Sequence, residues 1–168
     1  MKYIFGLGLP RTGMNSLGMA LHLMGFNGEC SCILNDYHNK REKDNSNDTY
    51  KYILFNDAFQ ELDSLLHEDK IRDNKYILTI RDQQEWVQSL SSFQHEKVCT
   101  LKEMSMDEYS SKIKQYFVKH DCLKNLLILH IFKEEDEDIW KKLYAFLELD
   151  EDEDIVDSEF PNINLNQT

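Results

Sequence analysis

The chain has 168 residues, of which 41% are hydrophobic and 30% are charged, and its formal net charge is −12. A chain of this length buries enough surface to hold a core without disulfides or metals, so we expect one domain over residues 1–168. The acidic balance disfavours nucleic acid and anionic membranes as partners, because both require a surplus of Lys and Arg. No apolar run approaches the roughly 20 residues of a membrane helix, which predicts a soluble, cytoplasmic protein.

Strands and helices are expected to alternate along the chain. Residues 2–7 form an apolar run that stops at Gly8, and residues 15–24 carry apolar side chains at helical spacing up to Gly25. Residues 39–48 are polar without periodicity, which is typical of a surface loop. Further strands are expected at 52–55, 76–80 and 126–132, and helices after Asp57, after Asp82, after Ser105 and around 139–147. The tail, residues 150–168, is acidic and then irregular.

Continuous apolar strands, each followed by an amphipathic helix, indicate a parallel sheet that is covered on both faces. We therefore predict an α/β protein with three layers, in which a central, mostly parallel sheet of about 4–5 strands is flanked by helices. Ligands of such sheets bind beyond the carboxyl ends of the strands. The candidate residues are therefore those that follow the strands, namely Gly8 to Ser16, Asn56 to Asp57, Arg81 to Asp82 and the region after Phe132.

The loop after the first strand has the glycine spacing of a phosphate-binding loop. Gly8 and Gly13 form a G-x-x-x-x-G pattern between a strand and a helix. Backbone N–H groups of such a loop, with the positive end of the helix, bind phosphate or sulfate without any side chain. In a P-loop NTPase the next two residues are Lys and Ser or Thr, but here they are Met14 and Asn15. This departure disfavours a magnesium-dependent NTPase or kinase.

Several stretches of the sequence resemble the sulfotransferase superfamily. The string GLPRTGMNSLGMALHLMGF is similar to the opening of its small branch, with a G-x-x-R-T-G-T-x-S-L loop, and YILTIRDQQEWVQSL resembles that branch's V-R-D-P-x-x-W-x-x-S segment. The stretches LLILHIFKEEDEDIWKKLYAFLEL and FPNIN also resemble the branch, so the likeness spans nearly the whole chain except the polar insert. It implies a P-loop fold whose cofactor is 3′-phosphoadenosine 5′-phosphosulfate (PAPS), with PAP as product and no metal.

The resemblance also implies where PAPS binds. In the family the loop holds the 5′-phosphosulfate, which makes the following residues cofactor-binding candidates: Gly8, Pro10, Arg11, Thr12, Gly13, Met14, Asn15 and Ser16. An Arg and a Ser hold the 3′-phosphate, and Arg81 and Ser89 have the spacing of that pair. Arg11 stands where many sulfotransferases carry a Lys, so it would stabilise charge on the bridging oxygen during transfer. Met14 departs from the family, which usually has Thr there as a hydrogen-bond donor.

Other interpretations of these residues are open. Arg81 could pair with Asp82 or Glu85, with Ser89 as an ordinary helix residue, and Arg11 could be tied to a surface carboxylate. Trp86 could stack on the adenine, but its helical spacing with Leu90 and Phe93 favours the core.

The expected function is sulfuryl transfer from PAPS to a hydroxyl or amine acceptor by in-line displacement without a metal. The sequence does not identify the acceptor or the oligomeric state. A non-catalytic PAP- or PAPS-binding protein is the alternative, followed by a P-loop kinase. The acceptor must lose a proton, and Asp57, directly after the second expected strand, is our candidate base. Asp57 and Gln60 also have the spacing of a capping box, so base and helix cap both stay open.

Overall fold

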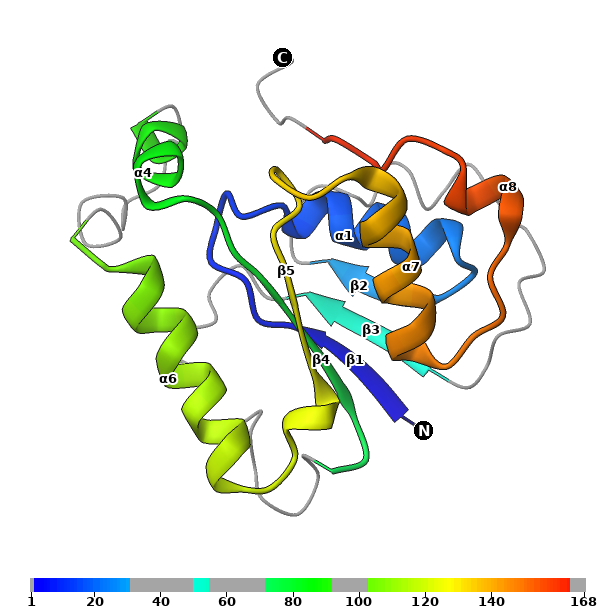
Figure 1. The fold of residues 1–168 in the computed structure, drawn as a ribbon, viewed down its shortest axis with the longest axis horizontal. Coiled ribbons are helices and arrows are strands. Elements are labelled where there is room, and N and C mark those ends of the chain that lie inside the picture. Colours follow the sequence, from blue (N-terminus) through cyan, green and yellow to red (C-terminus); the bar gives the residue numbers. More distant parts are fainter. Residues whose placement is uncertain (1, 31–49, 55–71, 92–102, 164–168) are drawn as a thin grey trace.

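The structure is a computed structural model that describes residues 2–30, 50–54, 72–91 and 103–163 (Figure 1). Its elements are β1 (Lys2–Gly6), α1 (Met14–Leu23), β2 (Asn27–Cys30), β3 (Tyr50–Leu54), β4 (Lys75–Thr79), α4 (Gln83–Ser91), α6 (Met106–Lys119), the 3-10 helix η1 (Leu123–Asn125), β5 (Leu126–Leu129), α7 (Asp136–Leu147) and α8 (Glu153–Val156). None of the helices in these ranges combines the length and the apolar character needed to cross a membrane.

The five strands form one parallel sheet with β1 at its centre. The strand order is β2-β3-β1-β4-β5, and Gly6 of β1 is in register with Leu54 of β3 and with Ile77 of β4. The chain fills one side of β1 with β2 and β3 before it crosses to the other side with β4 and β5. Ligand crevices of open α/β sheets form at such a reversal, beyond the carboxyl ends of the strands. The loop between β1 and α1 lies at this position.

Helices cover both faces of the sheet, which confirms the three layers predicted from the sequence. Figure 1 shows α1 and α7 on one side of the strands and α4 and α6 on the other. Because side chains alternate along a strand, Ile4 belongs to the core beneath α1 and α7, whereas Phe5 belongs to the core beneath α4 and α6. Both cores contain a tryptophan with no exposed surface, Trp140 in the first and Trp86 in the second.

Most expected helix boundaries agree with the structure because they depend on local hydrogen bonds. α1 ends before Gly25, which has a positive φ of 87°. Asp82 Oδ1 accepts a hydrogen bond from Gln84 N at 2.9 Å, so Asp82 caps α4 as predicted. Ser105 Oγ accepts from Glu108 N at 3.2 Å at the start of α6.

Three expectations about the elements were wrong in part. β2 was not expected, because its sequence Asn-Gly-Glu-Cys has no apolar run, and the strand exists through its backbone pairing with β3 at the sheet edge. β5 ends at Leu129 rather than Phe132, because the chain turns where Lys133 N donates to the carbonyl of His130. The tail contains the short helix α8, capped by Asp152. The insert 39–48 and the helix after Asp57 lie outside the described residues.

Candidate functional site

The loop between β1 and α1 contains a tight turn with a strained arginine. Thr12 N donates to the carbonyl of Leu9 at 3.3 Å, Pro10 occupies the second position of the turn, and Arg11 in the third position has a φ of 69°. Pro at the second position and a positive φ at the third are features of a type II turn, in which Gly or Asn normally takes the third place. An arginine there costs on the order of 1–3 kcal/mol and persists only where surrounding contacts fix the backbone.

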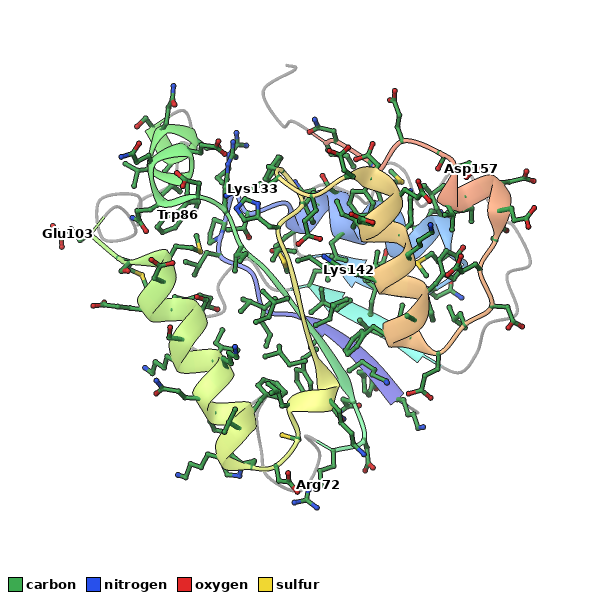
Figure 2. The ribbon with its side chains drawn as sticks, in the orientation of Figure 1. Arg72, Trp86, Glu103, Lys133, Lys142 and Asp157 are labelled. Carbon is green, nitrogen blue, oxygen red and sulfur yellow. The ribbon has the colours of Figure 1, made fainter. Side chains whose placement is uncertain are left out.

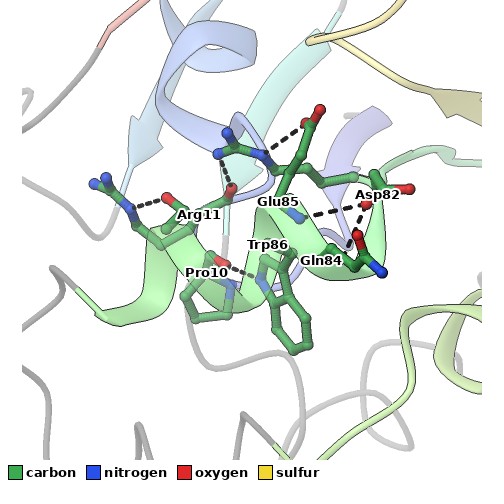
Figure 3. A network of polar contacts seen from close by, with 8 residues as sticks. Pro10, Arg11, Asp82, Gln84, Glu85 and Trp86 are labelled. Carbon is green, nitrogen blue, oxygen red and sulfur yellow. Dashed lines mark hydrogen bonds and ion pairs between the residues drawn. The ribbon is translucent and has the colours of Figure 1, made fainter.

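Those contacts are hydrogen bonds from side chains to the carbonyl groups of the loop. The donors and acceptors are Tyr109 Oη to Leu7 O at 2.7 Å, Thr12 Oγ1 to Leu9 O at 2.6 Å, Trp86 Nε1 to Pro10 O at 2.8 Å and Arg81 Nη1 to Arg11 O at 3.3 Å. Figure 3 shows the contacts of Pro10 and Arg11. Burial raises the pKa of Tyr109, so its hydroxyl stays protonated and able to donate.

The carbonyl contacts determine where the amides of the loop point. In a planar trans peptide the N–H of the next residue points opposite to the carbonyl. The N–H groups of Gly8 and Arg11 therefore point away from Tyr109 and Trp86, that is, away from the layer of α4 and α6. Helices α4 and α6 therefore bind carbonyl groups of the loop, and the N–H groups of Gly8 and Arg11 lie on the opposite side of the loop.

The N terminus of α1 adds further donors at the same place. Gly13 is the N-cap residue with a φ of 99°, no side chain among the described residues caps the helix, and the first turn contains no acidic residue. Uncapped first-turn N–H groups and the helix dipole favour an anion there. A Cβ on Gly13 would stand 3.0 Å from Ile131 Cδ1, so glycine also allows the loop to approach the turn after β5.

The side chains of three loop residues point into the protein rather than toward a ligand. Thr12, Met14 and Ser16 are 0%, 3% and 1% exposed. The thioether of Met14 occupies the space that Cβ atoms on Gly6 and Gly8 would fill, and Ser16 Oγ accepts a hydrogen bond from Ile163 N at 3.2 Å. These three residues can therefore offer a ligand only their backbone.

Two arginines lie beside the loop. Arg11 Nε donates to Ser89 Oγ at 3.0 Å (Figure 3). The guanidinium of Arg81 lies 4.2 Å from the ring centre of Phe132. Burial, and then the positive charge of Arg81, lower the pKa of Arg11. Within the part of the chain that the structure describes, no carboxylate pairs with Arg11. The like charges of Arg11 and Arg81 repel each other, which favours an anion in their neighbourhood.

The structure thus brings Arg11, Arg81 and Ser89 together around the loop, and the roles toward PAPS that the family resemblance implies for them stay predictions. The alternative pairing of Arg81 with Glu85 is present, because Arg81 Nε lies 3.7 Å from the carboxylate of Glu85, which is 57% exposed. The role of Arg81 toward a 3′-phosphate stays a prediction. Trp86 belongs to the core, as predicted, and also holds the loop through Pro10. Asp57 lies outside the described residues.

Sequence reasoning missed three residues that contact the site. They are Tyr109 on α6, Thr79 at the end of β4 and Phe132 after β5. Thr79 could have been noticed, because it is a polar residue inside an apolar strand at a ligand-binding end. Tyr109 carried no such signal, since an aromatic residue on the buried face of a helix is ordinary core.

The sequence matches the family described as sulfotransferase domain over residues 3–144, which is most of the chain. This chain belongs to that family. No curated protein matches it. Among solved structures, the fold is similar to that of the mouse sulfotransferase SULT7A1 complexed with PAP, with a TM-score of 0.51 and 12% sequence identity. The similarity covers 91% of this chain and 61% of the mouse chain, so this chain spans about three fifths of the mouse protein.

Proposed function

We propose that this protein transfers a sulfuryl group from PAPS to a hydroxyl or amine acceptor. One observation carries the proposal: Arg11, Arg81 and the N terminus of α1, which begins after the N-cap Gly13, converge on one loop in a chain of the sulfotransferase domain family. Each of the three supplies positive charge or N–H donors, and together they suit a ligand with several anionic oxygens. PAP, present in the similar mouse structure, is such a ligand.

In this proposal the loop holds the phosphosulfate end of PAPS. PAPS supplies the activated sulfuryl group, and the N–H groups of Gly8 and Arg11 with those of the first turn of α1 bind its anionic oxygens. The side chain of Arg11 stabilises the negative charge that develops on the bridging oxygen. In-line displacement then proceeds on the charge of Arg11 and the N–H donors of the loop, without a metal.

Arg81 and Ser89 hold the 3′-phosphate. The Phe132 ring packs against one face of the Arg81 guanidinium, and Nη1 donates a hydrogen bond to the Arg11 carbonyl. These two contacts orient the remaining N–H groups of Arg81. Ser89 lies in the same cluster, since its hydroxyl accepts a hydrogen bond from Arg11 Nε at 3.0 Å. Asp57 is the proposed general base, which takes the proton of the acceptor.

Calorimetry with PAP, 5′-AMP and ATP with and without magnesium tests this proposal. We expect PAP to bind about ten- to a hundredfold more tightly than 5′-AMP, because a charge-assisted bond to the 3′-phosphate contributes roughly 1.5–3 kcal/mol. Arg81→Ala should abolish the preference. Arg72→Ala is the matched control, since Arg72 is an exposed arginine that contacts the carbonyl of His120, away from the loop. Equal affinity of the wild type for the two nucleotides would contradict the proposal.

A non-catalytic PAP- or PAPS-binding protein is the second candidate, and Met14 favours it. A thioether has no hydrogen-bond donor, so the first residue of α1 offers the anion no side-chain donor. Loss of one donor from a transition-state site costs about 3 kcal/mol. Release of PAP from PAPS in the presence of phenols and amines separates the candidates: turnover supports the enzyme, and tight PAP binding without turnover supports the binding protein.

A further inference from the structure

Thr79 lies directly beneath the loop, and its side chain is fully buried. It is the last residue of β4, and its register partner on β5 is Leu129. A Cβ on Gly8 would overlap the hydroxyl of Thr79, so strand and loop are in the closest contact that glycine allows. Thr79 is thus the point at which the sheet touches the base of the loop.

The hydroxyl groups of Thr79 and Thr12 form a directed chain. The two oxygens are 2.7 Å apart, and Thr12 Oγ1 also lies 2.6 Å from the carbonyl of Leu9. A carbonyl can only accept, so the single hydroxyl proton of Thr12 is donated to Leu9. Thr79 must then donate its own proton to Thr12. The order of donation is therefore Thr79 to Thr12 to the Leu9 carbonyl.

This hydroxyl chain controls the turn that carries Arg11. The Leu9 carbonyl accepts from both the side chain and the N–H of Thr12, and the same turn holds Arg11 at its positive φ. Trp86 donates to the Pro10 carbonyl and Arg81 donates to the Arg11 carbonyl. Among the contacts that the structure describes, the hydroxyl chain alone joins this turn to Thr79, the last residue of β4. Loss of the Thr79 donor leaves the Thr12 oxygen buried with one partner fewer.

We propose that Thr79 is a positioning residue for anion binding: its hydroxyl orients Thr12 and thereby fixes the amides of the loop and the backbone of Arg11. Thr79 itself touches no ligand. The effect on PAP rests on the proposed function, whereas the effect on the order of the loop does not. The two consequences can therefore be tested separately.

The test compares Thr79→Val, which keeps the shape but removes the hydroxyl, with Thr79→Ser, which keeps the hydroxyl. We expect Thr79→Val to weaken PAP binding about tenfold, the effect of one buried hydrogen bond, and to speed hydrogen exchange of the amides of residues 8–13. Thr79→Ser should restore both. Exchange in β5 and α7 should stay unchanged in both variants.

Asn125→Ala is the control for general destabilisation. Asn125 makes buried hydrogen bonds to the carbonyls of Arg72 and Asn74, so its loss lowers the melting temperature without touching the loop. We expect it to leave PAP affinity unchanged. Wild-type affinity and wild-type exchange in Thr79→Val, or equal defects in the Val and Ser variants, would overturn the proposal. If the wild type binds no PAP, the proposed function fails, and the exchange data alone then support or overturn the role of Thr79.

Discussion

Polar and charged side chains are paired differently at the two ends of the sheet. At the amino ends of the strands, Lys75 pairs with Glu148 at 2.7 Å, and the side chain of Asn125 satisfies the carbonyls of Arg72 and Asn74. At the carboxyl ends, two arginines stand side by side and the first turn of α1 has no cap among the described residues. Figure 2 shows Arg72 far from Trp86, which marks the loop end.

The difference lies in charge: the pair at the amino end is balanced, whereas the carboxyl end keeps two arginines close to the start of a helix. A net charge of −12 makes a surplus of positive charge at one point unexpected, and nearby carboxylates would neutralise it if the fold alone decided the arrangement. Glu85 does approach Arg81, but from an exposed position at 3.7 Å. The side chains of Trp86 and Tyr109 also bind carbonyls of the loop, and the amides that follow these carbonyls point to the other side. Both features favour an anion from outside the chain.

The largest expected effect on PAP affinity comes from adding a side chain at Gly8, where the loop contacts β4. A Cβ in Gly8→Ala would overlap the hydroxyl of Thr79, so the loop must shift and its amides lose their common direction. We expect PAP affinity to fall about a thousandfold, since several charge-assisted hydrogen bonds of roughly 1.5–3 kcal/mol each are lost. Calorimetry measures this loss.

Gly28→Ala provides the matched control for that variant. A Cβ on Gly28 would overlap the backbone carbonyl of Tyr52, so β2 is equally closed to a side chain but is separated from the loop by β3. The melting temperature should fall while the folded protein binds PAP as before. Similar loss of PAP affinity in both glycine variants would mean that the loop end has no special role.

Replacing Asp57 is expected to lower turnover about a hundredfold without changing stability or PAP affinity. Asn caps a helix as well as Asp, so Asp57→Asn should keep the melting temperature and PAP affinity while turnover falls at least about a hundredfold. Asp82→Asn is the matched control, because Asp82 follows β4 and caps α4. If Asp57→Asn turns over like the wild type, Asp57 is only a cap, and a defect in Asp82→Asn would assign the base to Asp82.

The sequence was most informative where structure depends on neighbouring residues. Apolar runs followed by amphipathic helices predicted the layers, and the resemblance to the sulfotransferase superfamily singled out Arg81 and Ser89, whose side chains lie beside the loop. The directions of side chains within the loop could not be predicted. Met14 turns inward because Gly6 and Gly8 leave space for its thioether, and no short pattern in the sequence records such a fit.

Contacts between distant segments were equally invisible. Thr79 reaches Thr12 only because β4 lies beside β1, and Tyr109 reaches Leu7 only because α6 packs on that face. The strand β2 depends on the backbone of β3 rather than on its own side chains. Pairing and packing over long stretches of sequence therefore supply the rest of the site, and one sequence contains no direct signal of them.

The smallest expected effect belongs to the amino end of the sheet. The hydrogen bond from Lys75, and then its charge, lower the pKa of Glu148, so the folded state favours the carboxylate. Stability from this pair is present above the unfolded pKa of about 4.3 and is lost as the pH falls through the lower folded value. Because Glu148 is 78% exposed, solvent screens the pair and the effect is small.

The variant Glu148→Gln tests the contribution of the Lys75–Glu148 pair at the amino end of the sheet. The variant should melt slightly below the wild type at neutral pH and equally at a pH below the folded pKa of Glu148, where the wild-type carboxyl is protonated too. PAP affinity should be unchanged, because the pair lies at the end of β4 opposite to Thr79. A clear loss of PAP affinity in Glu148→Gln would show that the two ends are coupled through β4. The amino end would then serve ligand binding as well as the fold.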